Sequence, residues 1–136
     1  MKRYAYFLGF VTTLLFSTPG LGETATELGA FLGVWEAPPG GNQEILTLRS
    51  EGSTILGQYA FISQTAEHYE GTLEGTVQGR QFEGRWQEHP RHQPAALTQG
   101  RFSLTLSPEG NRLEGWYGPM DGLGRTPWIM QRPTPP

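Results

Sequence analysis

The stretch Leu73–Trp86, LEGTVQGRQFEGRW, contains the pattern that decides the fold. Apolar side chains or Gly occupy alternate positions on both sides of Gly79-Arg80, with polar side chains between them. A period of two is typical of a β-strand with one buried face. A turn centred on Gly79-Arg80 opposes Val77 with Phe82, and opposed residues of an antiparallel pair point to the same face. The stretch therefore predicts a hairpin with one apolar face.

The same five-residue unit recurs along the chain: apolar, any residue, Gly, any residue, large apolar. It occupies Phe31–Trp35, Ile55–Tyr59, Leu73–Val77, Phe82–Trp86 and Leu113–Tyr117. Residues 46–48, 102–106 and 128–130 continue the alternation without Gly, which predicts eight short strands in all. Only residues 23–31 show a weak helical preference.

Two more turns preserve the pairing of apolar positions. A turn at Glu51-Gly52 and another at Glu109-Gly110 bring inward positions opposite one another. The predicted partners are Leu48 with Ile55, Leu46 with Gly57, Glu44 with Tyr59, Leu106 with Leu113, Leu104 with Gly115, and Phe102 with Tyr117.

Inward glycines need a physical reason, because Gly inside a strand loses packing and costs conformational entropy. Gly allows a strand to bend towards closure and leaves room for a large side chain from across a narrow interior. We therefore predict an all-β fold, an eight-stranded antiparallel up-and-down barrel over residues 31–132. Its outer positions are mostly polar, such as Thr47, Glu74 and Arg85, which excludes an outer-membrane barrel with a lipid-facing apolar band.

The first 22 residues are typical of an export signal. Lys2 and Arg3 precede the apolar run Tyr4–Phe16, which is too short for a stable transmembrane helix. Small residues at Gly20 and Gly22 favour cleavage after Gly22. We therefore expect a signal peptide at 1–22, an N-terminal segment at 23–30, the barrel at 31–132 and a Pro-rich tail at 133–136, in a periplasmic or secreted protein.

Charge and composition exclude several functions. Residues 23–136 hold eight Arg and no Lys against thirteen Asp and Glu, a formal net charge of −5. Nucleic-acid binding through bulk positive charge is therefore not expected. No segment after the predicted signal is apolar for long enough to form a transmembrane helix, so membrane insertion after signal cleavage is not expected either. The chain has no Cys, which excludes disulfides and thiolate chemistry.

Gly33-Val34-Trp35 and Arg132 resemble the signature of the calycins, the group of lipocalins and avidins. In lipocalins a first-strand Trp packs beneath a late-strand Arg at the closed end of the barrel. The resemblance implies that Arg132 covers Trp35, a cation–π contact of about 0.5–2 kcal/mol. The repeated Gly-x-aromatic unit is also similar to that of small exported bacterial β-proteins.

Within the calycins, the avidin ligand arrangement is only partly present. Tyr59 falls where avidins carry a ligand-binding Tyr. Ala37 stands where they carry an Asn, and Phe61 stands where they carry a short hydroxyl side chain. The resemblance therefore implies no biotin binding by the avidin arrangement.

Aromatic residues and one acid share the predicted inner face. An apolar cup with a few polar groups is the usual form of a small-molecule site. Our leading hypothesis is non-catalytic binding of a small, largely apolar ligand, whereas the alternative is that the same side chains simply fill a narrow barrel. The predicted ligand-binding residues are Trp35, Glu44, Tyr59, Trp86, Tyr117 and Trp128.

Other functions remain open at this point. Trp116 points outward by parity and could anchor a protein partner, which would make the chain an inhibitor or assembly factor. An acid–base enzyme would use Glu44 with Tyr59. His89 and His92 form a His-x-x-His motif, but Pro90 prevents a helical turn, so we interpret the loop 88–94 as solvated. No metal or cofactor is expected.

Overall fold

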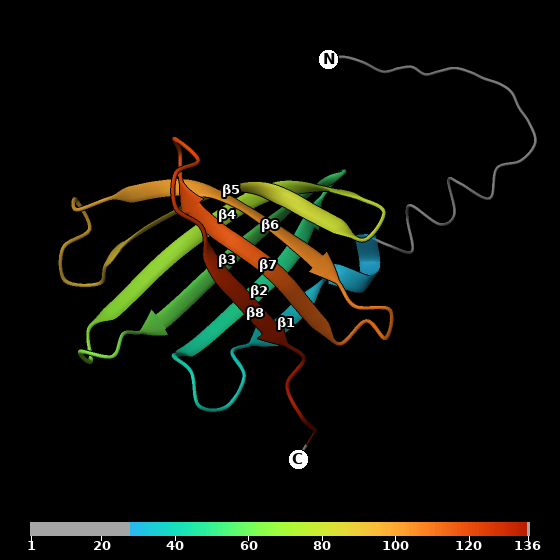
Figure 1. Cartoon of the computed structure of the whole chain (residues 1–136), viewed down its shortest axis with the longest axis horizontal. Helices are drawn as coiled ribbons and strands as arrows, with labels where there is room; N and C mark the ends of the chain where they lie inside the picture. Colours follow the sequence, from blue (N-terminus) through green and yellow to red (C-terminus); the bar gives the residue numbers. More distant parts are fainter. Residues whose placement is uncertain (1–27, 136) are drawn as a thin grey trace, which may run out of the picture.

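Eight antiparallel strands close into a barrel in the computed structural model, which describes residues 28–135. Each strand pairs with its neighbour in the sequence, and β8 returns to β1 (Figure 1). This confirms the predicted eight-stranded antiparallel closed barrel. The predicted signal peptide at 1–22, and residues 23–27 of the segment after it, lie outside the described residues. The strands are β1 (Gly33–Glu36), β2 (Gln43–Glu51), β3 (Thr54–Ile62), β4 (His68–Gln78), β5 (Gln81–Pro90), β6 (Thr98–Leu106), β7 (Arg112–Pro119) and β8 (Thr126–Gln131).

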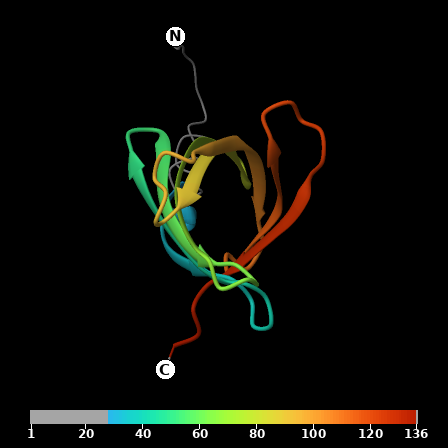
Figure 2. The same cartoon turned by 90° about the vertical axis from the view of Figure 1, so that its left-hand side faces the viewer.

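The two ends of the barrel differ. One end has short connections at 52–53, 79–80 and 107–111, and a helical turn over residues 28–31 lies there. The longer connections at 37–42, 63–67, 91–97 and 120–125 emerge at the other end, which we call the mouth. Figure 2 views the ring of strands from the left-hand side of Figure 1. No helix within residues 28–135 has the length and apolar character needed to cross a membrane.

Two of the three predicted hairpin registers are confirmed, and one is wrong. The pairs Val77–Phe82 and Leu106–Leu113 form as predicted. At the β2–β3 hairpin, however, Tyr59 lies opposite Leu46, while Glu44 lies opposite Phe61. The register differs from the prediction by two residues, so every side chain keeps its predicted face.

The turn type explains the wrong register. Gly52 has φ 63° and Gly79 has φ 61°, and in both hairpins the second turn residue, Ser53 or Arg80, has no positive φ. A positive φ at the first central residue alone is the type II′ pattern, which places Gly first. The turn is therefore Gly52-Ser53 rather than Glu51-Gly52.

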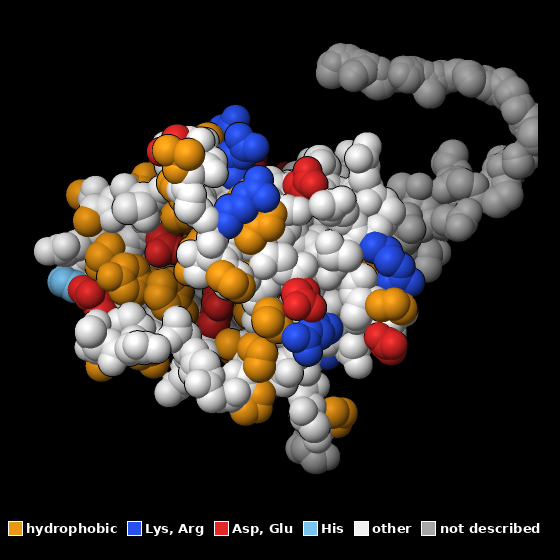
Figure 3. Space-filling view, viewed as in Figure 1, with side chains coloured by type: hydrophobic (Ala, Val, Ile, Leu, Met, Phe, Trp, Pro, Cys, Tyr) orange, Lys and Arg blue, Asp and Glu red, His pale blue; other side chains and the backbone are white. Residues whose placement is uncertain are grey.

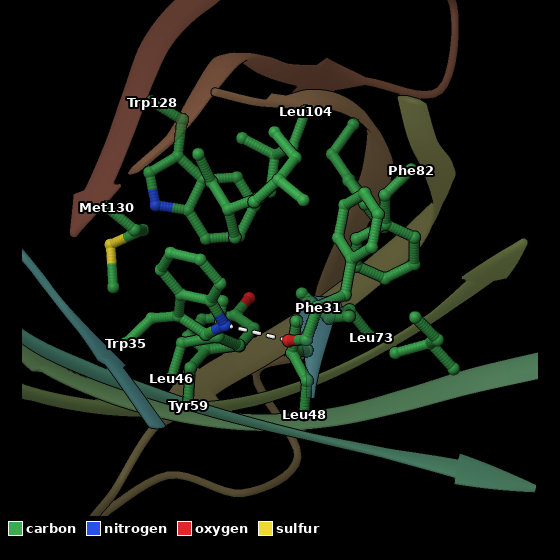
Figure 4. Close-up of a cluster of buried hydrophobic side chains, with 14 residues drawn as sticks. Phe31, Trp35, Leu46, Leu48, Tyr59, Leu73, Phe82, Leu104, Trp128 and Met130 are labelled. Atoms are coloured by element: carbon green, nitrogen blue, oxygen red, sulfur yellow. Dashed lines mark hydrogen bonds between the residues drawn. The ribbon is translucent and has the colours of Figure 1, made fainter. Parts of the chain in front are cut away.

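The barrel interior is filled by large apolar side chains, as Figure 4 shows. Trp35 and Phe31 are both fully buried, and the Trp35 indole Nε1 donates a hydrogen bond to the Phe31 carbonyl at 2.9 Å. The ring of Phe31 also meets the edge of Phe82, 5.8 Å between centroids. This packing closes the end of the barrel opposite the mouth.

Inward glycines receive aromatic rings from the strand next to them. Gly71 lies directly opposite Tyr59, and Gly100 lies directly opposite Trp86. A Cβ on Gly100 would lie 2.6 Å from the Trp86 ring, and a Cβ on Gly71 would collide with the Tyr59 ring. The prediction that inward Gly makes room for a large side chain from across the barrel is therefore wrong at these two positions, where the ring comes from the paired strand. At Gly75, Gly84 and Gly115, an added Cβ would instead collide with a backbone carbonyl oxygen of the neighbouring strand.

The seam between β1 and β8 is narrow and is reinforced by Arg132. Only Glu36 and Gln131 pair across it in the described chain. The Arg132 guanidinium donates hydrogen bonds to three carbonyl oxygens, those of Ala30, Leu32 and Val34, at 2.9, 2.8 and 3.1 Å. It also lies 3.9 Å from the centroid of the Trp35 ring. Arg132 therefore links the end of β8 to the residues around β1 by side-chain contacts, where the backbone ladder between the two strands has only one residue pair.

Gly33 is part of the same arrangement. It has φ 107°, a conformation that L side chains rarely adopt, and a Cβ there would lie 3.1 Å from Arg132 Nη1. The presence of Gly at position 33 is therefore explained by the local backbone, which has a positive φ and passes close to the Arg132 guanidinium.

Candidate ligand site

A small cavity lies at the mouth, inside the ring of strands, and we call it the mouth cup. Its volume is about 60 Å³. The strand ends next to the longer connections supply most of its lining. The lining residues are Asn42, Glu44, Tyr59, Phe61, Trp86, Glu88, Tyr117 and Trp128.

Aromatic rings form a continuous wall around the cup. Trp86 contacts Tyr117 edge-on at 6.1 Å between centroids, and Tyr117 contacts Trp128 at 5.8 Å. Trp128 in turn contacts Tyr59 at 6.2 Å, and Tyr59 stacks beside Phe61 at 6.4 Å. Such edge-to-face and stacked contacts hold the rings in a defined shape. The wall is therefore built before any ligand arrives.

Two carboxylates share the cup with these rings. Glu44, near the start of β2, accepts a hydrogen bond from Trp128 Nε1 at 3.2 Å. Glu88, near the end of β5, accepts one from the Tyr59 hydroxyl at 2.8 Å. Within residues 28–135, neither carboxylate forms a salt bridge or a second side-chain hydrogen bond. The cup therefore holds two acids and no compensating positive charge from the described chain.

The surroundings make both acids harder to ionise. Burial raises the pKa of Glu44 to about 7, the Trp128 hydrogen bond opposes this shift, and repulsion by Glu88 adds to it. Burial also raises the pKa of Glu88, while its hydrogen bond from Tyr59 acts in the opposite direction. The pKa of Tyr59 is raised, mainly by burial and then by the nearby Glu88 charge. Tyr59 therefore stays protonated and acts as a hydrogen-bond donor.

Most of the predicted ligand-binding residues meet at the cup. Glu44, Tyr59, Trp86, Tyr117 and Trp128 all line it, although Tyr117 remains 37% exposed. Trp35 does not line it, because it is buried beneath Arg132 near the opposite end of the barrel. The space available to a ligand is thus at the mouth rather than deep in the interior.

Trp116, the predicted protein-interaction residue, lies outside the barrel and is half-buried. The Arg125 guanidinium stacks on its ring at 3.9 Å from the centroid. A surface hollow beside it also includes Arg85 and Arg101. Part of the indole is therefore covered by the chain itself.

The His-x-x-His motif is split between a strand and a loop. His89 belongs to β5, which continues to Pro90, so the expectation of a loop over 88–94 is wrong for its first residues. Pro90 is the last residue of β5, so the backbone N–H that it lacks is missing only at the end of the strand. His92 lies in the loop with its Nε2 3.6 Å from Glu67 Oε2. The described residues contain no group of three or more His, Asp or Glu arranged to hold a metal ion.

Larger hollows lie on the outer face of the sheet. One, of about 390 Å³, is lined mainly by polar outward residues such as Thr47, Gln58 and Glu74, and a second of about 470 Å³ adjoins it. Trp86 lines the first and Tyr59 the second, but most of their wall residues point outward from the barrel, and neither hollow has the aromatic enclosure of the mouth cup. A further hollow of about 550 Å³ lies beside the connection 37–42 and shares Asn42, Glu44 and Phe61 with the cup. We therefore take the mouth cup as the candidate site.

Glu88 lines the cup but is absent from the site residues predicted from the sequence. Its position was available from parity, since Glu88 follows Trp86 by two residues and β5 keeps its alternation. The nearby Pro90 favoured a loop and hid this signal. Phe61, considered only as a departure from the avidin pattern, also lines the cup.

The lining residues limit the chemistry of the cup. A carboxyl group with a pKa of about 7 is suited to proton transfer at neutral pH. The lining residues, however, include no Ser, Thr, Cys, Lys, His or Arg. They therefore supply no aliphatic hydroxyl, thiol or amine nucleophile and no cationic side chain for a developing oxyanion, although the hydroxyls of Tyr59 and Tyr117 and two carboxyl groups are present.

Family models, curated proteins and solved structures were each compared with the chain, and none matches it.

Proposed function

We propose that this protein is a non-catalytic binding module that takes the end of a small ligand into the mouth cup. The observation that carries the proposal is the preformed aromatic wall around two acids at the mouth of a barrel whose interior is otherwise filled. Concave apolar walls with a few polar groups are the usual composition of small-molecule sites.

The size of the cup limits what enters it. Drug-sized ligands occupy about 300 Å³ or more, whereas the cup offers about 60 Å³. One water needs a volume of about 10–15 Å³ measured in the same way, so the cup has room for roughly four to six groups of that size. The ligand is therefore a very small molecule, or a longer one that inserts only one end.

The surface around the mouth is compatible with a ligand that extends outward. Tyr117 is partly exposed, and the nearby 120–125 connection carries exposed Met120 and Leu123. Figure 3 shows hydrophobic side chains with acidic ones among them towards the left-hand end of the molecule. An apolar tail on the ligand would find partners there without entering the barrel.

The four tryptophans provide an internal test by NMR. Small amphiphilic compounds are titrated into labelled protein while the indole N–H signals are followed. We expect shifts at Trp86 and Trp128, which line the cup, with Trp35 and Trp116 as internal controls that stay unchanged. Shifts confined to Trp116, or no shift with any compound, would refute the proposal.

A further inference from the structure

The mouth cup lacks a positive charge. Glu44 and Glu88 both line it, and each holds one hydrogen bond from a neutral donor. No Arg or His of residues 28–135 forms a salt bridge with either acid. Charged groups in a partly buried site are costly unless they are paired, so a bound cation would supply what the chain omits.

The walls are also suited to a cation. The faces of Trp and Tyr rings attract positive charge through their quadrupoles, most strongly when water is excluded. Two Trp and two Tyr rings line the cup in continuous contact. Aromatic walls with nearby carboxylates are chemically selective for organic ammonium groups, which are attracted to both.

Other ligand classes fit less well. An anion would face two carboxylates at close range. A divalent metal needs several oxygen or nitrogen ligands, and no group of three or more candidate acidic or His ligands occurs in the described chain. A neutral apolar group would bury both acids without satisfying them. A trimethylammonium group consists of four heavy atoms, which is within the room for roughly four to six water-sized groups.

We infer that the mouth cup recognises an organic ammonium ion, with its cationic end between the rings of Trp86, Tyr117 and Trp128 and its charge facing Glu44 and Glu88. This inference rests on the proposed function, because it names the ligand class for the same cup.

The test compares choline with dimethylbutanol, its uncharged isostere in which carbon replaces nitrogen. Binding to full-length mature protein is measured from the indole N–H shifts at neutral pH, with wild type, Glu44→Gln and Glu88→Gln. Both substitutions keep the side-chain shape and an acceptor oxygen. Glu74→Gln is the matched control, since Glu74 is an exposed acid on the outer face of β4.

We expect choline to bind wild type and the Glu74→Gln control equally, and to bind Glu44→Gln and Glu88→Gln at least about tenfold more weakly. This fold-change corresponds to loss of one charged partner. Dimethylbutanol should bind weakly and equally to all four proteins. If dimethylbutanol binds as tightly as choline, the ammonium inference fails and the proposed function stands. If neither probe, nor any other compound in the titration, shifts Trp86 or Trp128, both fail.

Two further arms define the ligand. Potassium chloride at the same concentration as choline should leave the indole signals unchanged, and equal shifts would show that bare charge rather than an organic ammonium is bound. Phosphatidylcholine vesicles carry the same trimethylammonium group on a lipid. Cosedimentation with these vesicles would place the ligand on a membrane surface, whereas choline binding without cosedimentation would indicate a free ammonium compound.

Discussion

Replacing Glu44 by Gln should stabilise the protein at alkaline pH and leave it unchanged at acid pH. In the folded chain the Glu44 carboxyl has a pKa of about 7, compared with 4.5 as its ordinary value, because burial disfavours the charged form. The folded state therefore holds a proton between about pH 4.5 and 7 that the unfolded state has released. Linkage then requires the free energy of unfolding to fall as the pH rises through this window.

The magnitude follows from the size of the shift. One pKa unit corresponds to about 1.36 kcal/mol, so a rise from 4.5 to about 7 makes wild type lose about 3 kcal/mol of stability by pH 8 through this group. The substituted side chain carries no charge at any pH, and its amide oxygen still accepts the hydrogen bond from Trp128. Glu44→Gln should therefore exceed wild type by up to about 3 kcal/mol at pH 8 and equal it at pH 4.

Urea denaturation at pH 4, 6 and 8 measures this difference directly. Glu74→Gln is the control, because Glu74 is exposed on the outer face of β4 and should track wild type at every pH. The reasoning is refuted if Glu44→Gln and wild type lose stability in parallel between pH 4 and pH 8.

Two predictions concern the framework that holds the cup. Arg132→Ala should lower the free energy of unfolding by about 2–4 kcal/mol, because it removes three hydrogen bonds to carbonyl oxygens and the Trp35 stack from the narrow β1–β8 seam. Urea denaturation measures this change. A loss under about 0.5 kcal/mol would contradict the conclusion that Arg132 reinforces the seam. Gly71→Ala should cost about 1–3 kcal/mol and shift the Tyr59 ring signals, because the added Cβ collides with that ring. Gly41→Ala is the matched control, because its Cβ would meet only the Pro38 carbonyl oxygen, at 3.6 Å. It should leave both the stability and the Tyr59 ring signals unchanged. Equal effects of the two variants would argue against the collision at Gly71.

Periodicity was enough to predict which side chains point inward. The spacing of Tyr59, Trp86 and Trp128 assigns each to the inner face, and the structure has them there. Parity does not distinguish registers that differ by two residues, which is why the β2–β3 pairing was wrong. Only the position of Gly52 in the turn decides between the two registers.

The depth of the ligand space could not be predicted from the sequence. It depends on how the rings of Phe31, Trp35 and Phe102 fill the interior, and therefore on rotamers and contacts between strands far apart in the chain. The pairing of Tyr59 with Glu88 likewise joins residues 29 positions apart. Their meeting depends on the extension of β5 to Pro90, which the local sequence disfavoured.

The most direct test of the account is a carbon-detected NMR titration of the Glu44 carboxyl, first alone and then with saturating choline. We predict a midpoint near pH 7 in the free protein and a clear downward shift with choline, because a bound cation stabilises the carboxylate. A midpoint near 4.5 that choline does not move would contradict two claims: that burial raises the pKa of Glu44, and that the cup binds an organic ammonium ion.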